Sequence, residues 1–129
     1  MKLVLSLILS VLLSGCFIFG DPTEFDETSG QSDDWIINEA EFFSSSNNWT
    51  KAIAYLEAGE KRFPNSKLAP QFKLNLAYAY KEFYRVPEAS AMINKFIRVH
   101  PNHPAMDYAY YFRGIILFKD KGFFKKISM

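Results

Sequence analysis

Two histidines stand three residues apart in the stretch HPNHP, and they are the side chains of this chain best suited to binding a metal ion. A metal site in a protein needs three or four converging ligands, such as imidazoles, thiolates or carboxylates. His100 and His103 are the only histidines of the chain, and Asp107 is the only carboxylate close to them. Pro101 and Pro104 prevent the continuous helix that would place both imidazoles on one face. The stretch therefore predicts a joint between two helices and no metal site.

The other patterns that indicate catalysis are missing from the sequence. It has no Gly-x-Ser-x-Gly nucleophile turn, no phosphate-binding loop, no dinucleotide-binding glycine motif and no Cys/His pair. Paired carboxylates occur in the acidic N-terminal part, where we expect no pocket. The excess of Lys and Arg among many aromatic residues could indicate RNA binding, but an exported protein would not normally meet nucleic acid. We expect neither an enzyme nor a nucleic-acid-binding protein, and no cofactor.

The single cysteine, Cys16, ends an N-terminal stretch that is typical of an export signal. Lys2 precedes an apolar run over residues 3–13, which is too short for a membrane-spanning helix of about 20 residues. The run ends in LSGC, which resembles the lipobox of bacterial lipoproteins, where the thiol is diacylated and the chain is cut before the cysteine. We expect residues 1–15 to be a lipoprotein signal peptide and Cys16 to carry the lipid. Phe17 follows in place of the aspartate that retains lipoproteins in the inner membrane, which favours the outer membrane.

Charge divides the chain into an acidic beginning and a basic remainder. Residues 16–50 hold eight Asp or Glu and no Lys or Arg, whereas residues 51–129 hold fourteen Lys or Arg and six Asp or Glu. Residues 16–33 also lack a sustained apolar period, so they cannot bury enough surface to offset the entropy of ordering. We expect a flexible acidic tether over residues 16–33, followed by one folded domain over residues 34–129.

From Asp33 onward the chain repeats itself with an offset of 37 residues. The matching pairs are Ala40 and Ala77, Phe43 and Tyr80, Ala52 and Ala89, Leu56 and Ile93, and Pro64 and Pro101. Small residues let two helices cross closely, aliphatic residues supply the core, and each proline ends a helix. The pattern resembles the tetratricopeptide repeat, a pair of antiparallel helices that stacks into a solenoid. We predict an all-α helical solenoid with repeats at about 34–66 and 67–103 and a partial third repeat at 104–129.

Five helices are expected, at about 34–44, 49–62, 67–83, 87–100 and from 104 onward. Asn47 or Asn48 is the expected N-cap of the second helix and Ser66 that of the third. The tryptophan at the head of the repeat consensus is replaced in the three copies by Ile36, Lys73 and Tyr110.

The first helix of each pair lines the concave face of such a solenoid, where repeat proteins bind extended peptides. The spacing from the crossing residues places on this face Asp34, Ile37, Glu41, Gln71, Leu74, Tyr78, Tyr108, Tyr111 and Ile115. Tyrosine rings can hold apolar or aromatic side chains while their hydroxyls form hydrogen bonds, although some of these tyrosines could instead belong to the core. We predict a peptide-binding stripe formed by Leu74, Tyr78, Tyr108 and Tyr111.

Longer stretches of the chain add a family resemblance. NNWTKAIAYLEAGEKRFPNS, LNLAYAYKEF and FIRVHPNHPAMDYAYYFRG resemble the BamD family, lipoproteins of the outer-membrane β-barrel assembly machinery. The resemblance implies a non-catalytic scaffold, lipid-anchored to the outer membrane and facing the periplasm. It also implies three kinds of partner: unfolded β-barrel precursors, the integral barrel-assembly protein and companion lipoproteins. Family members continue beyond the third repeat, so we expect a truncated form; the alternatives are another cell-envelope repeat lipoprotein and an inert truncated product.

Overall fold

The computed structural model describes residues 27–120, which form five α-helices and no strand. The helices are α2 (Asp33–Ser45), α3 (Trp49–Arg62), α4 (Ala69–Glu82), α5 (Val86–Val99) and α6 (Met106–Asp120). The predicted all-α class and the five predicted helices are confirmed. Residues 1–15, Cys16 and the first part of the expected tether lie outside the described residues.

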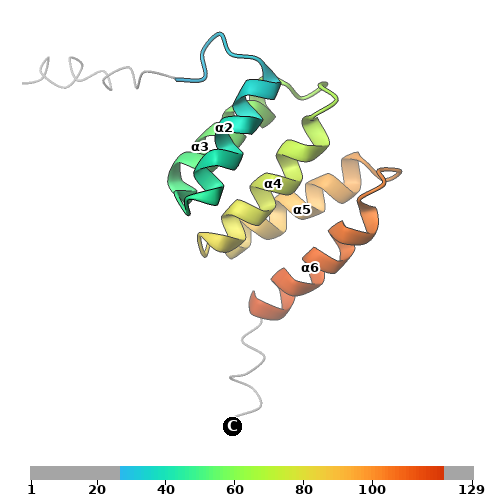
Figure 1. Cartoon of the computed structure of the whole chain (residues 1–129). Coiled ribbons are helices and arrows are strands. Elements are labelled where there is room, and N and C mark those ends of the chain that lie inside the picture. The colour runs from blue at the N-terminus through green and yellow to red at the C-terminus, as the bar shows by residue number, and fades with distance from the viewer. Residues whose placement is uncertain (1–26, 121–129) are drawn as a thin grey trace, which may run out of the picture.

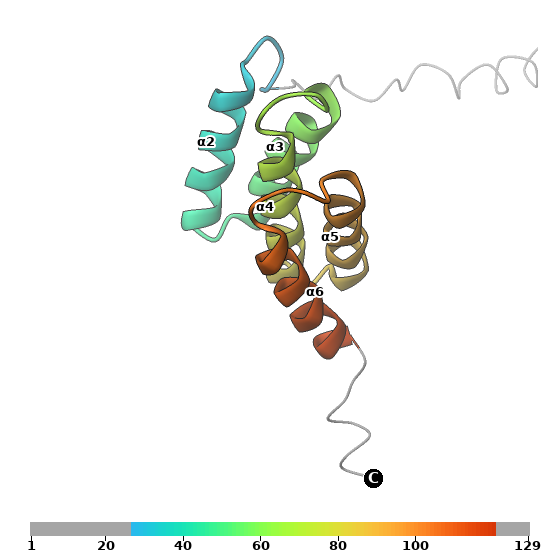
Figure 2. The ribbon, with the colours of Figure 1, turned by 90° about the vertical axis from the view of Figure 1, so that its right-hand side faces the viewer.

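The helices form two layers, with α2, α4 and α6 in one and α3 and α5 in the other (Figure 1, Figure 2). Each helix packs against the next along the chain. The joints between them are short, so the chain reverses direction after every helix and the pairs stack side by side. This is the arrangement of a helical-repeat solenoid, and the layer of α2, α4 and α6 lines one face of it.

The residues that repeat with the 37-residue offset form the centre of the stack. Ala40, Ala52, Ala77 and Ala89 each expose 1% of their surface or less, as do the aliphatic pair Leu56 and Ile93. Burying one large aliphatic side chain contributes about 1.5 to 3 kcal/mol to stability, so these positions hold successive helices together.

Phe43 departs from the repeat because it is only half-buried, whereas its counterpart Tyr80 exposes 6% of its surface. The Phe43 ring lies 5.4 Å from the Tyr55 ring, and the Lys51 ammonium lies 4.9 Å from the Phe43 ring centre. The difference follows from position: α2 is the first described helix of the stack, and within residues 27–120 no helix precedes it.

The N-caps agree with the sequence in one case and differ in another. Asn48 caps α3, because its side chain accepts a hydrogen bond from the Lys51 amide at 3.3 Å. Ser66 was expected to cap α4, but that helix begins at Ala69 with Leu68 at the N-cap position. Pro70 explains the difference, because proline lacks an N–H and is suited to the first turn of a helix.

Ser66 instead links two segments. Its hydroxyl accepts a hydrogen bond from the Leu68 amide and donates one to the Asp33 carboxylate at the start of α2. This bond lowers the pKa of Asp33. The turn before α4 is thereby tied to the first helix of the stack.

The HPNHP stretch is a joint, as predicted, between α5 and α6. The His103 amide donates to the His100 carbonyl at 3.1 Å, and His103 Nδ1 accepts from the Ala105 amide at 3.1 Å. Both imidazoles pack on the ring of Phe96, at 5.6 Å for His100 and 5.3 Å for His103. In the part of the chain that the structure describes, His, Cys, Asp and Glu form no group of three that could hold a metal ion.

The described end of the expected tether contacts α3 through Glu27 and Thr28. Thr28 exposes 4% of its surface. The Arg62 guanidinium donates hydrogen bonds to the Thr28 carbonyl and, at 3.0 Å, to the Thr28 hydroxyl. The Tyr55 hydroxyl donates to the Glu27 carboxylate at 2.5 Å. Composition could not predict these contacts, because it does not show which side chains of α3 bind Glu27 and Thr28. The flexible tether over residues 16–33 stays a prediction.

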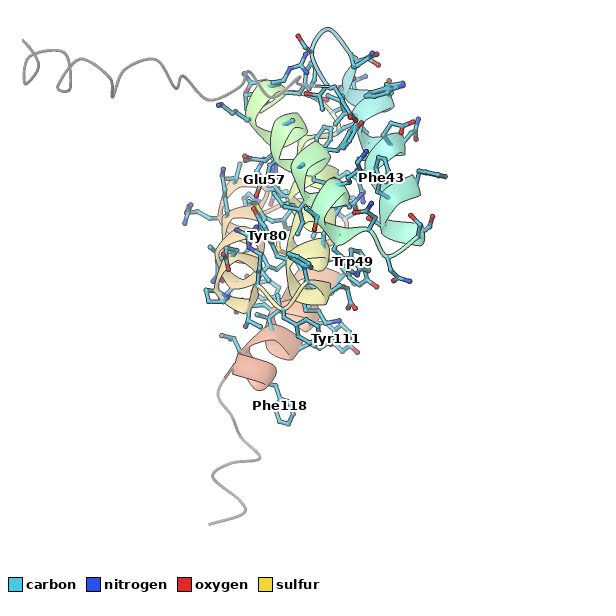
Figure 3. All side chains as sticks on the ribbon, turned by 90° about the vertical axis from the view of Figure 1, so that its left-hand side faces the viewer. Phe43, Trp49, Glu57, Tyr80, Tyr111 and Phe118 are labelled. Carbon is cyan, nitrogen blue, oxygen red and sulfur yellow. The ribbon has the colours of Figure 1, made fainter. Side chains whose placement is uncertain are left out.

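One face of α6 carries exposed apolar side chains, namely Tyr110, Tyr111, Leu117 and Phe118. Phe118 points away from the helices at the end of the stack (Figure 3). Gly114, the counterpart of the buried Ala77, has open space around it. None of the described helices is long and apolar enough to cross a membrane.

Candidate peptide-binding groove

Three helices enclose a groove of about 480 Å³ on the face formed by α2, α4 and α6. Its lining residues are Glu41 and Ser44 from α2, Gln71, Leu74, Asn75 and Tyr78 from α4, and Tyr108 from α6. The spacing explains the α4 wall, because residues three, four and seven positions apart share one face of a helix. Leu74 is buried at the bottom, and Tyr78 and Tyr108 expose 42% and 44% of their surfaces.

The two lining tyrosines belong to a row of aromatic rings that crosses the stack. Tyr108 stacks on Phe112 at 5.7 Å with an interplanar angle of 13°. Tyr78 lies 6.2 Å from Phe112 and meets Trp49 edge to face at 5.9 Å. Such pairs contribute about 0.5 to 1.5 kcal/mol beyond the area that they bury. The row therefore fixes the orientation of both tyrosines while one surface of each ring remains open.

Amide side chains provide hydrogen-bonding groups along the same groove. The Gln71 side-chain amide donates to Asn75 Oδ1 at 2.6 Å. Within residues 27–120 neither side chain forms another hydrogen bond, so the Gln71 oxygen and the Asn75 nitrogen keep unused capacity. One acceptor and one donor side by side match the C=O and N–H groups of an extended peptide.

The charges around the groove are unevenly placed. Glu41 is the one charged residue in the lining. Lys81 lies beyond the tyrosines, with its ammonium 5.4 Å from the centre of the Tyr78 ring and paired with Glu82. Burial, followed by the neighbouring Tyr78, raises the pKa of Tyr108. The Tyr108 hydroxyl therefore stays protonated at neutral pH and can donate a hydrogen bond to a ligand.

The structure brings together three of the four residues expected in the stripe. Leu74, Tyr78 and Tyr108 line the groove, whereas Tyr111 exposes 67% of its surface and does not line it. Of the other residues expected on this face, Glu41 and Gln71 line the groove, and Asp34, Ile37 and Ile115 do not.

Sequence reasoning missed Ser44, Asn75 and the supporting rings Trp49 and Phe112. The position of Asn75 four residues after Gln71, and of Phe112 four residues after Tyr108, would have indicated two of them. Trp49 carries no such signal, because it reaches the row from the start of α3. Cys16, the expected lipid attachment site, lies outside the described residues.

The chain is similar over most of its length to a known family. Residues 31–127 match the family YfiO, described as an outer membrane lipoprotein. The outer membrane protein assembly factor BamD of Neisseria meningitidis serogroup B is 38% identical over 132 residues, which cover 98% of this chain and 48% of that protein. BamD of Vibrio cholerae is 33% identical over 107 residues, covering 83% of this chain and 44% of that protein. The chain thus spans about half the length of these curated relatives. From the match over residues 31–127, the chain belongs to the YfiO family of outer membrane lipoproteins.

Proposed function

We propose that this chain acts in outer membrane protein assembly and holds an extended segment of an unfolded outer-membrane protein in the groove. The observation that carries the proposal is the pair of half-exposed rings, Tyr78 and Tyr108, above the apolar floor of Leu74. The relatives named outer membrane protein assembly factor BamD support the same role.

The chemistry of the groove suits such a segment. An aromatic side chain of the ligand can stack on Tyr78 and Tyr108 and exclude water from the floor at Leu74. The free amide groups of Gln71 and Asn75 can pair with the ligand backbone. A volume of about 480 Å³ lies within the range of sites that hold a few side chains. Binding in this role needs no catalytic group, so the proposed function is that of a scaffold.

The location and the partners are part of the same proposal. A lipid on Cys16 would hold the chain at the periplasmic face of the outer membrane, in line with the LSGC sequence and the family description. There the chain would assemble with the integral barrel-assembly protein and companion lipoproteins. It would present unfolded β-barrel precursors to them for insertion into the membrane.

A peptide-binding experiment tests the groove. A fluorescent peptide with one aromatic residue is titrated with the detergent-purified chain, and its anisotropy gives the dissociation constant. Tyr78→Ala and Tyr108→Ala should each weaken binding about three- to tenfold, because each removes one stacking ring. Tyr111→Ala is the matched control, since it removes a tyrosine from the same helix as Tyr108 but outside the groove.

Circular dichroism must show the same helix content in all variants. Unchanged affinity in the Tyr78→Ala/Tyr108→Ala double variant would contradict the proposal. An equal loss of affinity in Tyr111→Ala would move the site away from the groove.

A further inference from the structure

Resting on the proposed function, we infer that Glu41 makes the groove select segments that carry a basic side chain beside the aromatic one. The groove would then recognise two features of a ligand. The rings of Tyr78 and Tyr108 take the aromatic side chain, and the carboxylate of Glu41 takes a Lys or Arg.

Glu41 is available for such a contact. Its side chain is exposed, and it forms no ion pair with any residue between Glu27 and Asp120. The other lining residues are neutral. A cation that enters the groove therefore meets one carboxylate that none of the described residues neutralises.

The helix that carries Glu41 strengthens the negative potential at this wall. The sequence of α2 contains Asp33, Asp34, Glu39 and Glu41 and no Lys or Arg. Glu41 lies in the second half of α2, toward the end where the free carbonyl groups of a helix carry a partial negative charge. The α2 wall of the groove is negative for two independent reasons.

The opposite end has a different character. It consists of the aromatic row, with the Lys81 ammonium over the Tyr78 ring. The two sides of the groove therefore differ: the α2 side is acidic, and the α4 and α6 side is aromatic. In an extended peptide alternate side chains point to the same side, so the basic and aromatic residues of a preferred ligand stand an even number of positions apart.

Paired peptides test this inference on the detergent-purified chain. One peptide carries a tyrosine and a lysine two or four positions apart, and the other has glutamine in place of the lysine. The wild-type chain should bind the lysine peptide roughly two- to fivefold more tightly, as is typical of a solvent-exposed ion pair, and added salt should reduce the difference. Glu41→Gln should abolish the difference, and Glu41→Lys should make the chain prefer a peptide with glutamate at that position.

Glu39→Gln is the matched control, because it removes the same charge from α2 outside the groove lining. It should leave the preference for lysine in place. Equal affinity of the wild-type chain for the lysine and glutamine peptides would overturn the inference and leave the proposed function intact. A lysine preference that survives Glu41→Gln would overturn it too. Failure of every peptide to bind would overturn both proposals.

Discussion

The Lys73 ammonium lies 3.7 Å from Oε1 of Glu60, inside the stack, where Lys73 exposes only 3% of its surface. Lys73 stands at the head position of the second repeat, which Ile36 fills in the first repeat with no exposed surface. Lys95 approaches the same Glu60 oxygen at 2.5 Å. Burial lowers the pKa of Lys73, and the Glu60 carboxylate opposes that shift. One carboxylate thus compensates two ammonium groups from different helices.

The first prediction is that removing the Glu60 carboxylate lowers the free energy of unfolding more than removing the buried ammonium of Lys73. Glu60→Gln should lower the free energy of unfolding by about 2 to 3 kcal/mol, because it leaves the Lys73 ammonium buried without a counter-charge. Lys73→Met should cost less, since an apolar side chain of similar length fills the same space. Urea denaturation at neutral pH measures both values. A larger loss in Lys73→Met than in Glu60→Gln would contradict this account.

The second prediction concerns the contact between Gly59 on α3 and Phe72 on α4. A Cβ atom at Gly59 would overlap the ring of Phe72, which has no exposed surface. Gly59→Ala should therefore destabilise the fold by about 1 to 3 kcal/mol, although alanine is the better helix former. Adding Phe72→Leu should recover part of the loss, and a double-mutant cycle measures the coupling. If the stability changes of Gly59→Ala and Phe72→Leu simply add, the two residues do not constrain each other's size.

The third prediction is a loss of stability at mildly acidic pH that depends on His100. Its Nε2 atom is buried and has no hydrogen-bond partner among residues 27–120. Burial, with smaller effects of Lys73 and His103, lowers the pKa of His100 below its usual 6.5. The unfolded chain therefore takes up this proton more readily than the folded chain. The stability that neutral His100 contributes is fully present above about pH 6.5, the pKa in the unfolded chain. It is lost as the pH falls toward the lowered pKa of the folded chain.

Thermal unfolding from about pH 7 to about pH 5 tests this dependence. The wild-type melting temperature should fall more steeply with acid than that of His100→Phe, which cannot be protonated. His103→Asn keeps a side-chain acceptor near the Ala105 amide and serves as the control, because it retains His100. Parallel slopes for the wild type and His100→Phe would contradict the assignment.

The fourth prediction follows from the N-terminal sequence, in which Cys16 is the expected lipid attachment site. Cys16→Ala should leave an uncleaved precursor that incorporates no labelled fatty acid and does not fractionate as a lipoprotein. Gel mobility and palmitate labelling in an expressing bacterium measure the two effects. Labelling that persists in the variant would exclude Cys16 as the acceptor.

Much of the fold could be predicted because the 37-residue offset fixes where helices cross and where prolines end them. The same offset located Leu74, Tyr78 and Tyr108, since residues at helical spacing around a crossing position share one face of the helix. It failed for Tyr111, the counterpart of Leu74 in the next repeat, which exposes 67% of its surface and does not line the groove.

Other features could not be predicted because they depend on contacts between distant parts of the chain. Gly59 fits Phe72, while the positions 37 residues later hold Phe96 and Ala109, both fully buried. The large and small residues have changed places between the two repeats. Comparing Gly59 with Phe96, and Phe72 with Ala109, shows two differences in side-chain size. It does not show that the two differences offset each other within one helix contact. The bond between Tyr55 and Glu27 likewise joins residues from different segments.

The docking of Glu27 and Thr28 on α3 also limits how far the helical domain can lie from residue 16. If Cys16 carries the proposed lipid, only eleven peptide units connect it to Glu27, the first residue that the structure describes. A fully extended chain spans at most about 3.5 Å per residue, so the domain can stand no more than roughly 40 Å from its point of attachment. Releasing residues 27–32 from Tyr55 and Arg62 would lengthen that reach by about half again. With Cys16 as the anchor, the side chains that bind this segment would determine how far from the membrane the groove can reach.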